Sequence, residues 1–354
     1  MLPLRMEIGG FDLASRVFIV AELSANHGGS LEVARETLKA MKRAGADAVK
    51  LQSFTADTIT IDSDHPDFQI DHGTLWDGTT LYKLYQEAAM PWEWHSELFE
   101  LASELGLICF SSPFDNTAVD LLEDLKAPAY KIASFEIRDI PLIRYAASKM
   151  KPMIMSTGIA REEDIFNAVN ACREMGNDQI ILLKCTSAYP ARVDEANLRT
   201  MSDYSDRFHV EIGLSDHTTG SLVPTVATSL GARFIEKHFI LNKDMDTPDK
   251  AFSMDESEFG EMVNAVREAE LALGKVSYEL VQNAEKNRKF GRSIYTAESL
   301  KKGDVLTTDN IRSIRPGFGL PPEYLPWLYG KVVNQDIEFG TPFSLEFLDE
   351  QISL

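Results

Sequence analysis

The sequence has few cysteines and lacks a long apolar run. Its three cysteines, Cys109, Cys172 and Cys185, lie in apolar or helical stretches and form no CxxC pair. This spacing argues against a disulfide framework or a zinc ribbon. The N-terminus lacks the pattern of a signal peptide, and no window approaches the roughly 18 apolar residues of a membrane span. The sequence therefore predicts a soluble, unexported protein of the reducing cytoplasm with no membrane partner.

Basic residues are also scarce. The chain has 35 Lys and Arg against 55 Asp and Glu, which gives a formal charge of -20, and its basic clusters are short. Binding a phosphate backbone needs a basic face, so no nucleic-acid partner is predicted. A small anion remains an option because it responds to a few local donors rather than to the total charge.

Apolar runs rich in β-branched residues alternate with amphipathic segments from Phe18 to about Gly274. Eight such runs are predicted as strands: 18–24, 48–54, 108–113, 129–134, 152–158, 180–187, 210–216 and 234–240. This alternation is typical of a parallel sheet with crossover helices, and eight units favour a closed (β/α)8 TIM barrel. A doubly wound open sheet is the alternative, but no GxGxxG follows the first run.

Two stretches interrupt the repeat. Residues 55–90 connect a strand to the next helix over an unusual length, which at this end of a barrel is typical of a substrate-covering loop. The other begins after the last barrel helix. We predict a catalytic barrel over 1–275, a charged linker over 276–292 and a small β-rich domain over 293–354 with turns such as KKGD and EFGTP.

Polar side chains gather at the predicted strand ends, where catalytic groups of a parallel barrel lie. Lys50, Lys131 and the hydroxyls of Ser134, Ser156 and Ser215 would converge there and offer donors to a phosphate and a carboxylate. For any one lysine, the alternative is a side chain that extends to solvent. Five donors from four strands favour an anion site.

His217 and His238 end adjacent predicted strands, so their imidazoles could share one metal ion. Few protein ligands and an open site suit a catalytic divalent ion that acts as a Lewis acid. The alternative is an ordinary buried histidine.

Glu22 and Glu136 could each face the anion site. Either could transfer a proton or accept sugar hydroxyls, and either could instead form a salt bridge with Lys50 or Lys131. Nucleophile schemes of the Ser-His-Asp or Cys-His type have no supporting motif, because there is no GxSxG and Cys185 lies within a predicted strand.

These motifs resemble the sialic acid synthase (NeuB-like) family over almost the whole chain. The resemblance is carried, in order, by AELSANHGGSLEVA, GADAVKLQSF, SSPFD, YKIASFEI, STGIA, KCTSAYP, GLSDHT and EKHF. The C-terminal RSIYTAESLKKGDVLT and IRSIRPGFGL are similar to the antifreeze-like (SAF, β-clip) domain of that family. AELSANH, the WEWH segment and KIASFEI are most similar to its pseudaminic acid synthase members.

The resemblance implies a transferase that condenses phosphoenolpyruvate (PEP) with an amino sugar. For a pseudaminic acid synthase the sugar is 2,4-diacetamido-2,4,6-trideoxy-L-altrose. A divalent metal, manganese or magnesium with cobalt as an alternative, would sit on His217 and His238. The implied PEP site is Lys50, Lys131, Ser134, Ser156, Ser187 and Ser215. The implied sugar site is Glu22, Gln52, Tyr189, Asp249 and Arg315.

The resemblance also implies a mechanism and an assembly. C3 of PEP attacks the sugar aldehyde, water adds to the resulting oxocarbenium carbon, and phosphate leaves, with Glu136 stabilising the cation and handling the water proton. Arg315 would reach the partner's sugar pocket in a domain-swapped homodimer.

Two positions concern the sugar rather than the reaction class. Gly28 stands where many members have asparagine, and Ser187 stands where neuraminate synthases tend to have asparagine. Neuraminate or legionaminate synthesis is the nearest alternative. A Schiff-base pyruvate aldolase using Lys131 or Lys184 is a more distant one. An ice-binding role for the C-terminal domain would need a flat Thr/Ala surface, which KKGD and PPEYLPW do not suggest.

Overall fold

The protein is described by a computed structural model that covers residues 6–71 and 77–349. The chain separates into two compact units, Met1–Gly274 and Lys275–Leu354. We describe each unit by itself. The limits that the sequence predicts for the linker, 276–292, stay a prediction.

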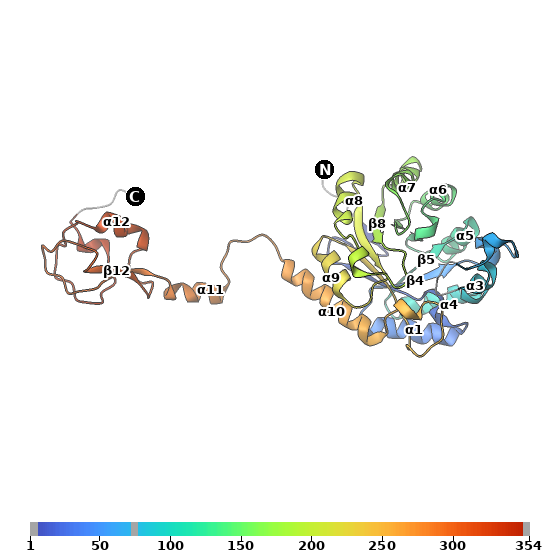
Figure 1. Ribbon diagram of the computed structural model, residues 1–354, viewed down its shortest axis with the longest axis horizontal. Helices are drawn as coiled ribbons and strands as arrows, with labels where there is room; N and C mark the ends of the chain where they lie inside the picture. The colour runs from blue at the N-terminus through green and yellow to red at the C-terminus, as the bar shows by residue number, and fades with distance from the viewer. Residues whose placement is uncertain (1–5, 72–76, 350–354) are drawn as a thin grey trace. The chain divides into compact units, whose positions relative to one another are not determined.

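The first unit is a closed barrel of eight parallel strands in the order β10-β3-β4-β5-β6-β7-β8-β9 (Figure 1). The strands are β3 Phe18–Glu22, β4 Ala48–Ser53, β5 Ile108–Pro113, β6 Tyr130–Ile132, β7 Met153–Ser156, β8 Ile180–Cys185, β9 Glu211–Asp216 and β10 Phe234–His238. Almost every residue of these strands is buried, as expected of a sheet covered on both faces. The predicted (β/α)8 barrel is confirmed.

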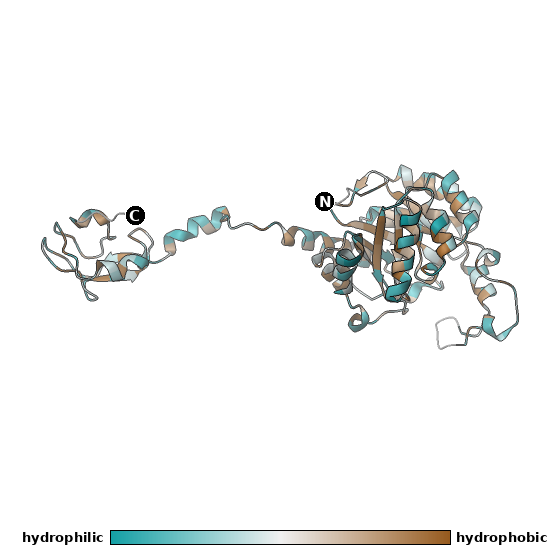
Figure 2. Ribbon diagram, turned by 90° about the horizontal axis from the view of Figure 1, so that it is seen from above, coloured by the Kyte–Doolittle hydropathy of each residue, from teal (hydrophilic) through white to brown (hydrophobic). Residues whose placement is uncertain are grey.

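Helices follow the strands and surround the barrel, with hydrophilic outer faces (Figure 2). They are α1 Leu31–Arg43, α4 Trp92–Glu104, α5 Asn116–Asp124, α6 Ile140–Ala147, α7 Glu162–Glu174, α8 Thr200–Phe208, α9 Leu222–Ser229 and α10 Glu256–Leu273. In α1 the Val33 N–H donates to the Ser30 side chain, which caps the helix. Ala34, Leu38 and Met41 share one buried face, as their spacing predicts.

A short antiparallel hairpin, β1 Glu7–Ile8 and β2 Phe11–Asp12, precedes the barrel. Its Ile8 packs with Phe18 and Phe234 in a buried apolar cluster of the barrel strands. The sequence did not predict this hairpin, because a two-residue strand is too short to show an alternation.

The carboxyl ends of the strands lead into segments that contain short helices. They include η1 Ser24–His27, η3 Ser134–Glu136, η4 Val193–Glu195 and η5 Lys250–Phe252. The predicted 55–90 loop contains α2 Ala56–Ile59, η2 Pro66–Phe68 and α3 Leu81–Ala88. Its residues 72–76 lie outside the described residues.

The second unit has its own apolar core, built on Ile294, Ile311, Leu328 and Phe343. Its elements are α11 Gln282–Asn287, η6 Arg288–Phe290, β11 Ser293–Thr296, β12 Ile311–Ile314, η7 Pro322–Tyr324, α12 Leu325–Leu328 and η8 Leu345–Phe347. β11 and β12 pair antiparallel. Across both units, no described helix is long and apolar enough to cross a membrane.

Candidate active site

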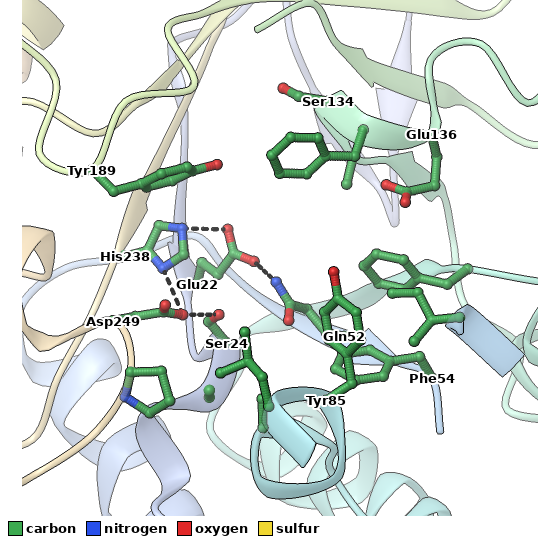
Figure 3. Close-up of a pocket in the computed structure, with 18 of the residues that line it drawn as sticks. Glu22, Ser24, Gln52, Phe54, Tyr85, Ser134, Glu136, Tyr189, His238 and Asp249 are labelled. Carbon is green, nitrogen blue, oxygen red and sulfur yellow. Dashed lines mark hydrogen bonds and ion pairs between the residues drawn. The ribbon is translucent and has the colours of Figure 1, made fainter. Parts of the chain in front are cut away.

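A cavity of about 520 Å³ lies at the carboxyl ends of the barrel strands (Figure 3). The predicted site residues all line it except Ser187 and Arg315. This convergence follows from topology, because parallel strands of a closed barrel all end on the same face.

Two buried lysines lie at the polar side of the cavity. Lys50 Nζ is 2.7 Å from Glu22 Oε1 and 3.3 Å from Glu236 Oε1, and Lys131 Nζ is 2.8 Å from the same Glu236 oxygen. Both lysine side chains are only 2% exposed, so the alternative of lysines that extend to solvent is wrong. The predicted salt-bridge alternative holds for Glu22.

Glu236 was not predicted as a site residue. Its Oε1 accepts hydrogen bonds from Lys131 Nζ and from Ser215 Oγ at 3.1 Å. In this structure one carboxylate oxygen therefore occupies the point where both ammonium groups could hold a substrate anion. Its place two residues before His238 on β10 was the only signal in the sequence.

The pKa values reflect this arrangement. Burial opposes ionisation of Glu22, but the Lys50 ammonium holds the pKa of Glu22 far below its usual range. Burial likewise opposes the charge on Lys50, whose pKa is nevertheless raised by Glu22 and Glu236. For Lys131 burial dominates and lowers the pKa. Lys50 is thus the more firmly charged of the two.

Serine hydroxyls surround the lysines. Among the described residues, the Ser156 Oγ is buried and has no hydrogen-bond partner. The Gly158 N–H donates to Ser134 Oγ at 3.1 Å, and a Cβ at Gly158 would lie 2.1 Å from Ser187 Oγ and 2.7 Å from Ser134 Oγ. Ser187 thus joins the cluster around Gly158, although it does not line the described cavity. These groups are suited to donate to an anion's oxygens.

His217 and His238 lie side by side, with ring centroids 5.3 Å apart. His238 Nε2 is 3.4 Å from Glu22 Oε2, and His238 Nδ1 is 3.7 Å from Asp249 Oδ2. His217 Nδ1 is 3.0 Å from the Thr186 carbonyl oxygen. When Nδ1 carries the proton and donates to this carbonyl, the lone pair of Nε2 is free to bind a metal.

This donor set fits a divalent cation. His238 Nδ1 is buried without a hydrogen-bond partner among the described residues, and burial lowers the pKa of His238, which favours the neutral, metal-binding form. Within residues 6–71 and 77–349, however, no group of three or more His, Cys, Asp or Glu side chains is already drawn together as a metal site. Among the described residues the structure thus shows two neighbouring histidines and no completed ligand set.

Cys185 lies 3.8 Å from His217, measured from Sγ to Nδ1, a proximity that the sequence did not predict. Burial of the thiol opposes its ionisation, but His217 lowers the pKa of Cys185 to about 7. The side chain is buried and does not line the described cavity, so it does not face a substrate as a nucleophile.

Glu136 lies across the cavity from the histidines, at the end of η3. Burial raises the pKa of its carboxyl to about 7. Its Oε2 is buried without a partner among the described residues, so the salt-bridge alternative is wrong for Glu136. A carboxyl that titrates near neutrality can donate or accept a proton at working pH.

The remaining polar wall lies between Glu22 and Asp249. Gln52 Nε2 donates to Glu22 Oε1 at 2.9 Å, and the Ser24 hydroxyl donates to Asp249 Oδ2 (Figure 3). The Tyr189 ring packs on His217 with centroids 4.5 Å apart. Ser24 also lines the cavity and was not predicted. Arg315 lies in the second unit, directly after β12.

Comparison with known proteins extends these observations. The chain is 49% identical over 335 residues to the pseudaminic acid synthase of Campylobacter jejuni strain 81-176, covering 95% of this chain and 97% of that protein. It is 48% identical over 335 residues to that of Helicobacter pylori, covering 94% and 98%. The N,N'-diacetyllegionaminic acid synthase of Legionella pneumophila is 35% identical over 338 residues, covering 94% of both chains.

Among solved structures, the spore coat polysaccharide biosynthesis protein SpsE of Bacillus subtilis matches with a TM-score of 0.64 and 32% identity, covering 99% of both chains. Residues 291–349 match the SAF domain. Residues 37–278, which include seven of the eight barrel strands, match the NeuB family, to which this chain therefore belongs.

Proposed function

We propose that the protein is a pseudaminic acid synthase that condenses PEP with 2,4-diacetamido-2,4,6-trideoxy-L-altrose. The observation that carries the proposal is the cavity in which two buried lysines lie beside a histidine pair. Identity of 49% to a pseudaminic acid synthase, against 35% to a legionaminic acid synthase, supports this choice of sugar.

PEP would bind at the lysines. Lys50 and Lys131 would hold its negative groups, with hydroxyls from Ser134, Ser156, Ser187 and Ser215 completing the site. Glu236 would have to give up part of its contact with the ammonium groups as the substrate anion arrives. Burial makes each remaining contact stronger than in water.

His217 and His238 would hold a divalent ion, for which manganese and magnesium are the first candidates. When bound, such an ion supplies Lewis acidity that polarises a carbonyl oxygen. The two imidazoles are held by the Thr186 carbonyl and by the Glu22 and Asp249 carboxylates.

The reaction would form one C–C bond and one C–O bond to water, and break the C–O bond to phosphate. C3 of PEP attacks the aldehyde carbon, and the carbonyl oxygen gains a proton. Water then adds to the cationic C2 of the former PEP and loses a proton, and phosphate departs from C2. Glu136 would face that carbon, stabilise the cation while ionised and take the proton of the water.

The sugar would lie against Glu22, Gln52, Tyr189 and Asp249, whose polar atoms suit hydroxyl and amide groups. We further propose that Arg315 reaches the partner's cavity in a domain-swapped homodimer. An Arg315→Ala variant should then retain PEP binding and lose affinity for the sugar.

The test is phosphate release from PEP with manganese present, measured with the altrose, with the corresponding mannose derivative and with N-acetylmannosamine. Release with the altrose alone supports the proposal. Release with another sugar keeps the reaction class and replaces the product.

A Schiff-base aldolase is less well supported, although burial lowers the pKa of both Lys131 and Lys184. Lys131 is ion-paired with Glu236, and Lys184 Nζ donates to the Cys185 carbonyl at 2.7 Å. Borohydride trapping with pyruvate and indifference to EDTA would favour the aldolase; loss of activity with EDTA supports the synthase.

A further inference from the structure

Helix α3 presents one apolar face to the cavity. Leu81, Leu84, Tyr85 and Ala88 follow the i, i+3, i+4, i+7 spacing of a single helical face, and all four line the cavity. The helix begins at the Thr80 cap, whose side chain accepts from the Lys83 N–H, and its opposite face is exposed at Lys83, Gln86 and Glu87.

Little of this apolar face packs into the core of the barrel. None of the eight described side chains of α3 is fully buried. Neither described apolar cluster of the barrel unit includes a residue of α3. An amphipathic helix normally buries its apolar face, so an apolar face turned to a cavity is suited to be covered by a ligand.

The wall is held in place from the strand ends. Phe54, which follows β4, contacts the Tyr85 ring edge-on at a centroid distance of 5.8 Å and contacts Phe114 at 5.1 Å. Tyr85 stands in the cavity beside Gln52 and across from His238 (Figure 3). Ile59 of α2 and Ile70 extend the same apolar lining. The strand ends therefore supply most polar groups of the cavity, and α3 supplies an apolar wall, while Asp67 and Gln69 before it add two polar side chains.

A ligand that fills this cavity needs one polar edge and one apolar edge. The amino sugar of the proposed function has two acetamido methyl groups and a methyl group at C6. N-acetylmannosamine has one acetamido methyl group and carries hydroxyls at C4 and C6. Apolar contact stabilises a methyl group but gives a buried hydroxyl no hydrogen-bond partner.

We propose that the α3 wall, formed by Leu81, Leu84, Tyr85 and Ala88, binds the methyl groups of the sugar and selects a 6-deoxy, bis-acetamido substrate over hydroxylated analogues. This inference rests on the proposed function and deepens it. A hydrophobic pocket discriminates against an added hydroxyl by about 100-fold, which sets the scale of the expected preference.

The experiment compares two sugars in the full-length enzyme with manganese: 2,4-diacetamido-2,4,6-trideoxy-L-altrose and the same sugar with a hydroxyl at C6. Leu84→Asn places an amide of similar size on the wall. Gln86→Asn, on the exposed face, is the matched control because it introduces the same residue into the same helix. The measured quantity is the ratio of kcat/KM for the two sugars, together with KM for PEP and a thermal melt.

We expect the wild type and Gln86→Asn to prefer the 6-deoxy sugar by about 100-fold. Leu84→Asn should reduce that preference about tenfold and leave KM for PEP unchanged. Leu81→Asn should act in the same direction and replaces Leu84→Asn if that variant melts early. If folded variants show the same ratio of kcat/KM as the wild type, the selective role of the α3 wall is wrong and the proposed function is unaffected. A wild type that turns over neither sugar overturns both.

Discussion

Ser24 is a buried residue with a left-handed backbone, at φ 48°. This conformation costs a residue other than glycine about 1–2 kcal/mol. The Ser24 hydroxyl donates to Asp249 in the cavity. Glycine at this position would relieve the backbone strain but would lack the hydroxyl that bonds Asp249. The strain is therefore retained together with that hydrogen bond.

We therefore predict that two variants at this position differ in stability and agree in activity. Ser24→Gly should be about 1 kcal/mol more stable than Ser24→Ala, because both lose the hydrogen bond and only glycine relieves the backbone. Both should lose kcat/KM for the sugar to the same extent. Urea unfolding and steady-state kinetics measure the two effects, and equal stability of the variants would contradict the strain.

Ionisation of Glu136 should appear as one limb of the pH profile of kcat/KM. Its folded pKa is about 7, so ionised carboxylate accumulates as the pH rises through that value. If the carboxylate accepts the water proton, kcat/KM should rise through pH 7, and Glu136→Gln should remove the limb and lower the rate at least 100-fold. A limb that persists in Glu136→Gln would assign it to another group.

The same group should link stability to pH. An unfolded carboxyl titrates at 4.5 and the folded one at about 7, so between these values the folded state holds a proton that the unfolded state has released. The stability contributed by Glu136 is present below pH 4.5 and is lost as the pH rises through 7. The free energy of unfolding of Glu136→Gln relative to wild type should therefore increase from pH 4.5 to 7, measured by denaturant titration.

At the scale of elements, β9 and β10 are joined by a buried ion pair. Lys237 and Asp216 are neighbours in register, with Nζ 2.5 Å from Oδ2, and the Lys237 ammonium also donates to the Thr218 carbonyl. Each residue of the pair directly precedes a histidine of the site. The pair thus fixes the spacing between His217 and His238.

Lys237→Met should cost about 3–5 kcal/mol, because it leaves the Asp216 carboxylate buried without its partner. Manganese affinity, measured by titration calorimetry on the folded fraction, should fall as well. Arg43→Met, which breaks an exposed pair with Glu256, is the control and should cost about 0–1 kcal/mol. Equal costs for the two variants would argue against this role.

The sequence predicts these elements well where periodicity is strong. All eight strands were located, but the run predicted over 129–134 is a strand only at Tyr130–Ile132, because η3 begins at Ser134 and turns Glu136 toward the cavity. The predicted lysines, histidines and glutamates converge because all parallel strands of a closed barrel end on the same face. The positive φ of Ser24 and the ion pairs of Glu236 with both lysines depend on three-dimensional packing, so the sequence alone could not reveal them.

At the scale of the whole molecule, the segment after α10 should be the first site of proteolysis. Val276 and Tyr278 are 91% and 96% exposed. Chymotrypsin should therefore cut at Tyr278 before it reaches Tyr204, which is buried in the barrel. Mass spectrometry of early digests checks the site, and first cuts inside the barrel would contradict the division into two units.

The separated barrel provides a further measurement. If Arg315 belongs to the sugar site, as proposed, the barrel fragment should unfold cooperatively and bind PEP but release no phosphate in the presence of the altrose. Full activity of the fragment would remove Arg315 and the second unit from the reaction.

The absence of fully buried side chains on α3 has a consequence for how this enzyme can change. A helix that contributes no fully buried side chain can be exchanged at little cost to the stability of the barrel. The residues proposed to hold PEP come from strand ends, whereas the apolar wall comes from an inserted segment. New sugar preferences can thus arise by exchange of α3 alone, Leu81–Ala88, while the strand ends that carry the other site residues stay unchanged.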